Sequence, residues 1–272
     1  MLRLWAGLGY YARGRNLHLA SRKIAFDLAG RFPETAEALA ALPGVGRSTA
    51  AAIAAFAFGE RAAILDGNVK RVLARHSGTP GFPGDKKVEA KLWMLAERRL
   101  PEKDVETYTQ ALMDLGATVC TRTAPRCDAC PVRSDCVARK RKLTEKLPAP
   151  RPRKSVPMRE TTWLVLRHAG KVLLERRPSR GIWGGLWSFP ELNGLNAARA
   201  CGQAGCRVRS TRALETIEHG FTHFRLQIRP VLCDVERAAP RAEQAGRMWI
   251  GIDDAQGAAV PKPVRTLLER LA

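Results

Sequence analysis

Acidic residues are scarce in this chain of 272 residues. Asp and Glu number 26 against 46 Lys and Arg, which gives a formal net charge of +20. This imbalance excludes an acidic disordered protein. It favours a polyanionic partner, with nucleic acid as the first expectation and an anionic membrane surface as the second.

Long apolar segments are also missing. No apolar run reaches the roughly 18 residues that a membrane-spanning helix needs. The N-terminal stretch does not match a signal peptide, because Arg3 interrupts its apolar run and Tyr10 and Tyr11 stand where small cleavage-site residues are required. We therefore expect a cytoplasmic protein without a membrane partner. Its seven cysteines would be reduced there, so that clustered cysteines indicate a metal rather than disulfides.

Alternating strand patterns are absent from residues 1–137, which look helical throughout. One helix is expected to open at Phe32-Pro33-Glu34 and to end at the turn 42–46. A second begins at Ser48 or Thr49 and is so rich in alanine that it must pack closely against its neighbours. Further helices are expected at about 86–99 and about 105–117.

The stretch 138–157 has a different composition. It holds eight basic residues, one acidic residue and four prolines, a net charge of +7 that is about a third of the total. We expect an exposed basic linker. It is either a solvated spacer or a strap that lies along a phosphate backbone.

Strand patterns fill residues 158–272. Segments 161–167 and 172–177 flank a short turn and predict a β-hairpin, and segments 221–235 and 247–252 predict further strands. Residues 263–272 form an amphipathic helical pattern. This half is expected to be α+β, and no internal repeat is visible.

Four cysteines have the spacing C-x6-C-x2-C-x5-C. Four thiolates within 17 residues can close around one metal centre, and their number suits zinc as well as an iron–sulfur cluster. Three further cysteines match no ligand spacing and are expected to be structural. The candidate ligands are Cys120, Cys127, Cys130 and Cys136, and the structural set is Cys201, Cys206 and Cys233.

A glycine turn at 42–50 (LPGVGRSTA) joins two expected helices. Gly44 and Gly46 allow backbone N–H groups to approach a ligand closely, and the next helix N-terminus adds unpaired donors and partial positive charge. Such a hairpin binds phosphate without reading sequence. Farther along, Asp66 precedes a helical pattern and could simply be its N-cap.

The cysteine spacing and the glycine turn together resemble the helix-hairpin-helix DNA glycosylases, the group of endonuclease III and MutY. The resemblance implies a two-domain chain: an all-α glycosylase domain with an iron–sulfur loop at 1–137, the linker at 138–157, and an α+β Nudix-like domain at 158–272. It selects a [4Fe–4S] cluster over zinc. It also implies that basic residues of the cysteine loop face phosphates, namely Arg122, Arg126 and Arg133.

Within that group, Asp66 matches the essential aspartate that stabilises the oxocarbenium-like sugar or attacks it. Members that also cut the backbone carry a lysine at position 48, whereas Ser48 cannot form an imine, so the resemblance implies a monofunctional enzyme. Tyr10, in GLGYYARGRNL, matches a tyrosine that inserts into the base stack, although Tyr10 and Tyr11 could instead be core aromatics. The expected DNA contacts are Tyr10, Gly44, Val45, Gly46, Arg47, Ser48 and Asn68, and the expected adenine pocket includes Gln110 and Met113.

The second half resembles the Nudix-like domain of MutY in GIWGGLWSFP (181–190). The segment after Pro190 has Glu191 but lacks the carboxylate cluster that binds Mg²⁺ in a Nudix hydrolase. We therefore expect this domain to recognise a lesion without hydrolysing a nucleotide. Phe221, Thr222 and His223 match a Phe-Ser-His loop that recognises 8-oxoguanine, with the hydroxyl retained in Thr222.

The family pattern has helices ahead of GLGYYARGRNL that carry a catalytic Glu, which protonates the adenine. No glutamate of this sequence takes that role, so Met1 is either a truncated start or that of a real short form. The resemblance implies a monomeric DNA glycosylase that removes adenine opposite 8-oxoguanine or guanine in double-stranded DNA. The alternatives are a non-catalytic lesion-binding protein, a glycosylase/lyase of endonuclease III type, and a Nudix nucleotide hydrolase.

Overall fold

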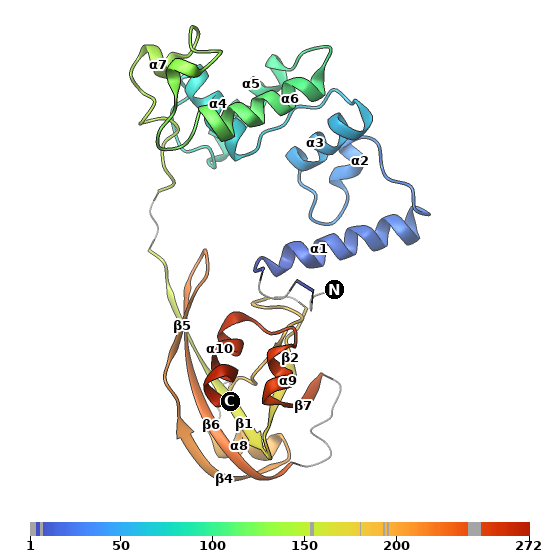
Figure 1. Ribbon diagram of the computed structural model, residues 1–272, viewed down its shortest axis with the longest axis vertical. Coiled ribbons are helices and arrows are strands. Elements are labelled where there is room, and N and C mark those ends of the chain that lie inside the picture. Colours follow the sequence, from blue (N-terminus) through green and yellow to red (C-terminus); the bar gives the residue numbers. More distant parts are fainter. Residues whose placement is uncertain are drawn as a thin grey trace. The chain divides into compact units, whose positions relative to one another are not determined.

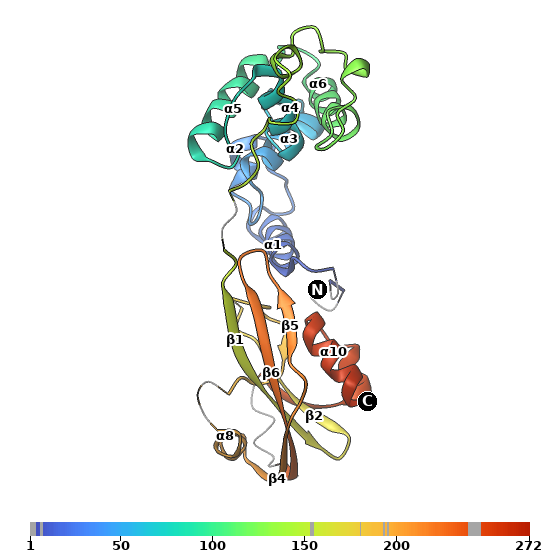
Figure 2. The ribbon, with the colours of Figure 1, turned by 90° about the vertical axis from the view of Figure 1, so that its left-hand side faces the viewer.

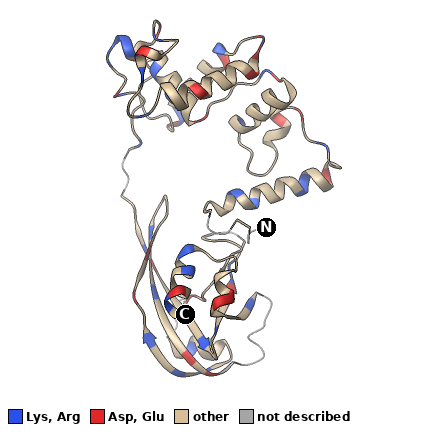
Figure 3. Cartoon of the chain, viewed as in Figure 1, with Lys and Arg blue, Asp and Glu red and all other residues tan. Residues whose placement is uncertain are grey.

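A computed structural model describes residues 4–5, 8–152, 155–179, 181–192, 194, 196–238 and 246–272. It consists of two compact units, Leu19–Lys154 and a second that combines Met1–His18 with Ser155–Ala272 (Figure 1, Figure 2). None of the helices among the described residues is long and apolar enough to cross a bilayer. Lys and Arg occur in both units (Figure 3), so the basic charge is not confined to the stretch at 138–157.

The unit Leu19–Lys154 is helical. Helix α1 begins in the other unit and ends in this one, and π-helical turns follow α1 and α6. The elements are α1 (Tyr11–Arg22), η1 (Lys23–Asp27), α2 (Ala36–Ala40), α3 (Arg47–Phe58), α4 (Gly67–Ser77), α5 (Lys86–Arg99), α6 (Val105–Asp114), η2 (Leu115–Val119), η3 (Cys127–Ala129) and α7 (Val137–Lys140).

Short polar side chains and glycines fix the ends of these helices. Thr35 caps α2 by accepting a hydrogen bond from the Ala38 amide, and Asp85 caps α5 through the amides of Lys87 and Val88. Helices α3 and α4 end at Gly59 and Gly78, both in the left-handed conformation that glycine adopts without strain. The expected helix at 86–99 coincides with α5, while the one expected at 105–117 ends earlier because it changes into η2.

Alanines allow α3 to pack closely, as its composition predicts. Ala50, Ala51, Ala54 and Ala55 are all buried. On one side α3 contacts the cluster around Leu39 and Leu42, and on the other the cluster around Leu73 and Leu92. The hairpin at 42–50 is therefore held between two small cores.

The basic stretch after the cysteines is not wholly a linker. Helix α7 packs on α4, with Ala138 fully buried, and Leu147 is buried as well. The Leu147 carbonyl accepts a hydrogen bond of 2.8 Å from Arg75 Nε, and the Ala149 amide donates to the Gly81 carbonyl. Residues 138–149 thus pack as part of the helical unit Leu19–Lys154.

The other unit is built on one mixed sheet with strand order β3-β2-β1-β6-β4, in which β5 also pairs with β6 and β7 with β2. Strands β1 and β6 run parallel, and the other pairings are antiparallel. The elements are β1 (Met158–His168), β2 (Lys171–Arg176), β3 (Trp187–Ser188), α8 (Ala197–Gln203), β4 (Cys206–Ala213), β5 (Ile217–Gly220), β6 (Arg225–Ala238), β7 (Arg247–Gly251), α9 (Ile252–Gln256) and α10 (Lys262–Leu271).

Both faces of the sheet are covered, because successive residues of β1 point to opposite sides. Trp163 and Val165 pack in the cluster that contains α9 and α10, whereas Leu164 and Leu166 pack in the cluster that contains α8. The three cysteines outside the spaced set, Cys201, Cys206 and Cys233, are buried in this second cluster, where structural thiols are expected. A hydrogen bond with Cys233, together with burial, raises the pKa of the Cys201 thiol.

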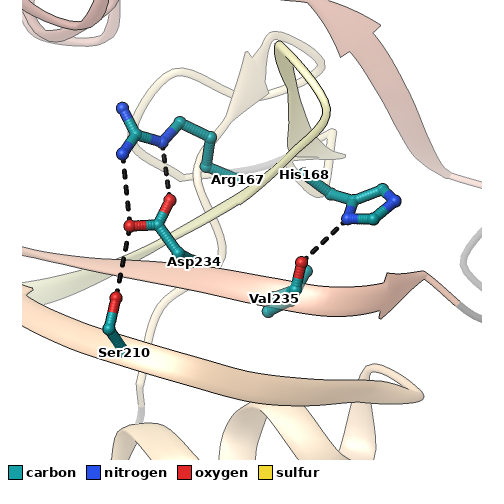
Figure 4. A network of polar contacts seen from close by, with 5 residues as sticks. All are labelled: Arg167, His168, Ser210, Asp234 and Val235. Carbon is teal, nitrogen blue, oxygen red and sulfur yellow. Dashed lines mark hydrogen bonds and ion pairs between the residues drawn. The ribbon is translucent and has the colours of Figure 1, made fainter.

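An ion pair joins the two parallel strands near one end of the sheet (Figure 4). Arg167 on β1 donates to both carboxylate oxygens of Asp234 on β6, at 2.7 and 3.2 Å, and Ser210 Oγ on β4 donates to Asp234 Oδ2 at 3.3 Å. Next to this pair, His168 Nδ1 lies 2.8 Å from the Val235 carbonyl. These contacts tie three strands together.

Candidate functional site

The hairpin presents backbone donors in open space. Gly44 has φ +79°, and the Val45 amide donates to the Leu42 carbonyl, which closes the turn. Gly46 is the N-cap of α3 and, having no side chain, leaves the first-turn amides of α3 without a side-chain cap. A Cβ built on Gly46 would meet nothing within 4 Å. A phosphate oxygen can therefore approach these amides.

Arg47, the first residue of α3, has partners on α5. Its guanidinium carbon lies 3.9 Å from the centre of the Trp93 ring, and Nη2 pairs with Glu97 Oε1. Trp93 and Glu97 are one helical turn apart, so both contacts come from one face of α5. Arg47 would have to leave Glu97 before it could contact a DNA phosphate.

The Ser48 side chain is linked to Asp66 through the backbone of the preceding residue. Ser48 Oγ accepts a hydrogen bond of 3.0 Å from the amide of Leu65, the residue before Asp66. Asp66 is the N-cap of α4, and its Oδ1 accepts from the Val69 amide at 2.7 Å. The cap that the sequence suggests is therefore present, and the carboxylate remains partly exposed beside the hairpin helix.

Asn68 is engaged within the protein. Its Oδ1 accepts a hydrogen bond of 2.9 Å from Arg71 Nη2, and the same guanidinium donates to the carbonyls of Gly116 and Cys120. A Cβ on Gly116 would lie 2.7 Å from the Asn68 Cβ, so η2 approaches α4 closely only because residue 116 is a glycine. Sequence reasoning missed Arg71, whose contacts at 116 and 120 have no local signal.

The two expected adenine-pocket residues on α6 have different surroundings. Gln110 is exposed and donates to Asp114 Oδ1 at 2.8 Å. Met113 packs against the apolar cluster of α4 and α5. Gln110 thus lies at the surface of α6, and Met113 lies against the core of the helical unit.

All four spaced cysteines line one cavity between α4 and the loop 120–136. Arg75 reaches into this loop: Nη1 lies 3.4 Å from Cys120 Sγ and 2.6 Å from the Thr121 carbonyl, and Nη2 donates to the Arg122 carbonyl. The Cys136 thiol lies 3.7 Å from the Arg75 carbonyl. Burial, and then the nearby Cys120, Cys136 and Cys130, raise the pKa of the Cys127 thiol. The lining consists of Arg75, Val119, Cys120, Pro125, Arg126, Cys127, Cys130, Arg133, Cys136, Arg139 and Thr144.

The donor set suits a cluster better than a single ion. In the described part of the chain, no three His, Cys, Asp or Glu side chains converge closely enough to hold one metal ion. A [4Fe–4S] cluster offers a separate iron to each cysteine, so its four ligands stand farther apart than those of a tetrahedral zinc. Four thiols around one small cavity fit that requirement.

The three arginines expected to face phosphates are exposed, but two of them also brace the cysteine loop. Arg126 Nη2 donates to the Thr118 carbonyl at 2.8 Å, and Arg133 donates to the Asp128 carbonyl. Arg122 has no side-chain hydrogen bond within the described residues.

The residues 221–223, here called the recognition loop, join β5 to β6. Phe221 is half-buried in an aromatic cluster, with ring centres 5.4 Å from Trp183, 4.7 Å from His219 and 4.5 Å from Phe224. Burial and, to a lesser extent, Lys262 lower the pKa of His219. Thr222 and His223 are exposed at the tip of the loop. Phe221 thus anchors the loop, and the two polar residues are free to meet a ligand.

Tyr10 lies in the same unit and is 77% exposed. Its φ of +44° follows a Gly9 with φ +70°, and a non-glycine residue at positive φ is held there by its surroundings. Tyr11 behaves differently and packs against the core cluster of the sheet. Of the two tyrosines, only Tyr10 points away from the core.

The carboxylates near the expected Nudix segment are paired with arginines. Glu191 Oε1 pairs with Arg177 Nη1, and Glu175 Oε2 accepts from Arg247 at 3.0 and 3.1 Å. In the described residues of this unit no group of acidic side chains is arranged to hold a metal ion.

Comparisons with known proteins confirm the expected family and fold. The model of the HhH-GPD superfamily of base excision DNA repair proteins matches residues 1–98, and the NUDIX domain model matches residues 161–270. The adenine DNA glycosylase of Buchnera aphidicola (Acyrthosiphon pisum) is 32% identical over 99% of this chain and 77% of its own length. The human adenine DNA glycosylase is 33% identical over 94% of this chain and 58% of its own length.

Among solved structures, a thermostable thymine-DNA glycosylase is 32% identical, with a TM-score of 0.42 over 47% of this chain and 58% of its own. The chain belongs to the adenine DNA glycosylase family, as a DNA glycosylase with a helix-hairpin-helix domain followed by a NUDIX domain.

Proposed function

We propose that this chain is a monofunctional adenine DNA glycosylase, which hydrolyses the N-glycosidic bond of adenine opposite 8-oxoguanine or guanine in double-stranded DNA. The observation that carries the proposal is the hydrogen bond from the Leu65 amide to Ser48 Oγ. It fixes the backbone before Asp66 against the hairpin helix. It also occupies with a hydroxyl the position where a lyase needs an amine that can form an imine.

Asp66 is the residue that stabilises the reacting sugar. One carboxylate oxygen is occupied by the Val69 amide, and the other has no hydrogen-bond partner among the described residues. As the glycosidic bond breaks, its electron pair leaves with adenine and positive charge develops on the sugar. A fixed carboxylate lowers the energy of that state more than the energy of the bound substrate. Water then adds to the sugar carbon, and the proton that this water loses ends on the departing adenine, so that the products are free adenine and a sugar with a hydroxyl in place of the base.

The hairpin and the cysteine loop supply the grip on the duplex. The first-turn amides of α3, behind Gly44 and Gly46, bind one phosphate, and the exposed side chains of Arg122, Arg126 and Arg133 bind others. Val45, Arg47 and Asn68 lie on the same two helix starts and support this contact. The chain acts as a monomer on chromosomal DNA in the cytoplasm.

A [4Fe–4S] cluster is the cofactor that the loop 120–136 would hold, through Cys120, Cys127, Cys130 and Cys136. When bound, the cluster supplies four covalent anchors for the loop rather than a reacting centre. Arg75 holds the same loop from α4 through two of its backbone carbonyls, those of Thr121 and Arg122. Together they keep the loop's arginines in place for the duplex.

Lesion recognition belongs to the other unit. Thr222 and His223, exposed on a loop that Phe221 anchors, contact 8-oxoguanine, and Tyr10 inserts into the base stack beside it. Gln110 and Met113 on α6 contribute to the adenine pocket. Extruding the base costs a few kcal/mol, which these contacts repay.

The Asp66→Asn variant tests the catalytic role. Asparagine caps a helix as well as aspartate, so α4 should keep its N-terminus while the charge is lost. We expect adenine release from a duplex with adenine opposite 8-oxoguanine, under single turnover, to fall at least about 100-fold. Asp85→Asn, the same change at the cap of α5, is the control and should leave the rate unchanged.

Two further outcomes decide the class of protein. Release by Asp66→Asn at the wild-type rate would refute the role of Asp66. Tight binding of the mispair by the wild-type chain without any release would identify a lesion-binding protein. Borohydride should trap no covalent adduct with DNA, and a trapped adduct would identify a lyase.

A further inference from the structure

The start of helix α1 and the glycine turn in GIWGGLW (181–187) lie far apart in the sequence but contact each other in one unit. Arg15 Nη1, on α1, donates a hydrogen bond of 2.8 Å to the carbonyl of Gly184, which is 169 residues away. One turn earlier, Tyr11 packs against the core cluster that contains Trp183 and Leu186. A polar and an apolar contact thus attach the start of α1 to the turn in GIWGGLW.

The turn that accepts Arg15 is rigidly built. Trp183 and Gly185 have φ values of +53° and +78°, and a Cβ on Gly184 would lie 2.4 Å from the Ser179 carbonyl oxygen. The Gly185 amide donates back to the Arg177 and Pro178 carbonyls. Trp183 itself is buried against Trp163, with ring centres 5.9 Å apart. The Gly184 carbonyl is therefore held in one direction.

The residue that Arg15 holds in place is Tyr10. Trp5 Nε1 donates to the Gly9 carbonyl at 3.0 Å, and the Trp5 ring lies so close to Gly14 that a Cβ there would be 2.9 Å from it. Trp5 thus braces the turn before Tyr10 against α1. The exposed ring of Tyr10 thus lies on a segment that Arg15 ties by a hydrogen bond to the strand-bearing part of the unit.

The same turn supports the recognition loop. Trp183, the neighbour of Gly184, packs against Phe221 with ring centres 5.4 Å apart and against His219 at 5.5 Å. The contact of Arg15 and the anchor of the recognition loop are therefore adjacent on one short segment. Motion of one is transmitted to the other through a buried tryptophan.

We infer that Arg15 is a positioning residue that fixes Tyr10 relative to residues 221–223. Insertion of Tyr10 into the base stack and contact of residues 221–223 with the lesion then occur as one event. The inference rests on the proposed function, in which Tyr10 inserts and residues 221–223 recognise the lesion. Arg15 acts through Tyr10 in this arrangement, because Nη1 of its guanidinium is held by the Gly184 carbonyl.

Binding measurements with Arg15→Met test the inference without catalysis. Methionine keeps the length and helix propensity of the side chain but cannot donate to Gly184. The dissociation constants would be measured at one salt concentration for a duplex with a cleavage-resistant 2′-fluoroadenosine opposite 8-oxoguanine and for an undamaged duplex. We expect the preference for the lesion duplex to fall roughly tenfold, as for loss of one charge-assisted hydrogen bond.

Two further variants separate a positioning role of Arg15 from the loss of its positive charge. Arg31→Met removes the same charge at an exposed residue that has no side-chain hydrogen bond within the described residues. It should weaken both duplexes equally and leave the preference unchanged. Tyr10→Ala should lower the preference by itself, and adding Arg15→Met to it should cause little further loss, because both changes remove one shared function.

An unchanged lesion preference in Arg15→Met, or full additivity with Tyr10→Ala, would overturn the inference. A wild-type chain with no lesion preference would overturn the proposed function instead. In that case, amide hydrogen exchange of residues 8–18 still tests whether Arg15 holds this segment in place. Faster exchange in Arg15→Met than in Arg31→Met would support that role, and equal exchange in the two variants would refute it.

Discussion

Ser48 has a structural task of its own at the position where lyases of this fold carry a lysine. Its hydroxyl accepts a hydrogen bond from the amide of Leu65, a residue that is 3% exposed, so little solvent can reach this amide to replace the bond. An unpaired buried amide costs about 1–3 kcal/mol. The most direct way to avoid that cost is a shift of the backbone at Leu65, which would carry Asp66 with it.

The Ser48→Ala variant should therefore release adenine more slowly while still binding the lesion duplex. We expect the single-turnover rate to fall roughly tenfold, because a carboxylate displaced by a fraction of an ångström stabilises the sugar less well. Ser48→Thr keeps the hydroxyl and should retain most of the rate. Equal rates for Ser48→Ala and the wild type would show that Leu65 does not depend on this bond.

At the residue scale, what the sequence could predict was local. Asp66 is visible as a cap from its neighbours, and Ser48 from its place in the glycine turn, since both signals lie within a few residues. Arg71, Arg75 and Arg15 were missed because their hydrogen bonds reach carbonyls 45 to 169 residues away. In a sequence this basic, the residues next to an arginine do not indicate whether its side chain donates to a backbone carbonyl or binds a phosphate.

At the scale of elements, the parallel pair β1 and β6 depends in part on a carboxylate. The hydrogen bond from Arg167, and then its charge, hold the pKa of Asp234 below the ordinary value of an aspartate, against the opposing effect of partial burial. An Asp with a lowered folded pKa contributes stability that is fully present above its unfolded pKa of about 3.9. That contribution is lost as the pH falls through the lower folded pKa.

Asp234→Asn should consequently destabilise the sheet unit more at neutral pH than in acid, where the contribution of the carboxylate declines as the pH approaches its lowered folded pKa. Because the side chains of the pair are each 34% exposed, we expect about 1 kcal/mol or less at pH ~7. Urea unfolding of the wild type and the variant at neutral pH and near pH ~3 would measure the difference. Glu236→Gln, which removes a more exposed pair at 3.9 Å, is the control and should show no pH-dependent difference. A loss for Asp234→Asn that is the same at both pH values would contradict this account.

Elements with a strong local sequence pattern were predicted well. In the segment after the cysteines, by contrast, the basic composition conceals residues that pack against the helical unit. The limits of α5 follow from Asp85 and from a regular pattern of apolar residues. In residues 138–149, a few apolar side chains, among them Ala138 and Leu147, dock on α4, and eight basic residues across 138–157 conceal them. A buried carbonyl at Leu147, paired with Arg75, fixes that docking, and neither partner reveals it in the sequence.

At the scale of the whole molecule, the chain order and the folding units do not coincide. The sequence favours a first domain that starts at residue 1, and the compact unit that holds the strands after residue 154 also includes the described residues among 1–18. Such a pairing depends on contacts between the two ends of the chain, Arg15 with Gly184 and Tyr11 with the sheet core, which no local pattern encodes. The two-domain fold class itself was predictable, because helical and strand patterns separate cleanly along the chain.

Two units with separate cores should unfold in two transitions, and the chain contains a reporter for each. Five of its six tryptophans lie in the sheet unit, namely Trp5, Trp163, Trp183, Trp187 and Trp249, while Trp93 lies in the helical unit. Fluorescence therefore follows the sheet unit. Far-ultraviolet circular dichroism is dominated by the helical unit, which holds the longest helices. If the cysteine loop holds a cluster, its removal acts on the helical unit alone.

Oxidative removal of the iron should thus lower the thermal midpoint seen by circular dichroism by at least about 5 °C, since the loop loses four anchors on a unit of this size. The midpoint seen by tryptophan fluorescence should stay where it was, because none of the candidate ligands lies in the sheet unit. Chelator without oxidant is the control and should move neither midpoint. A common shift of both midpoints would mean that the two units unfold as one cooperative structure, and no shift in either would mean that α4, Arg75 and α7 hold the loop without the cluster.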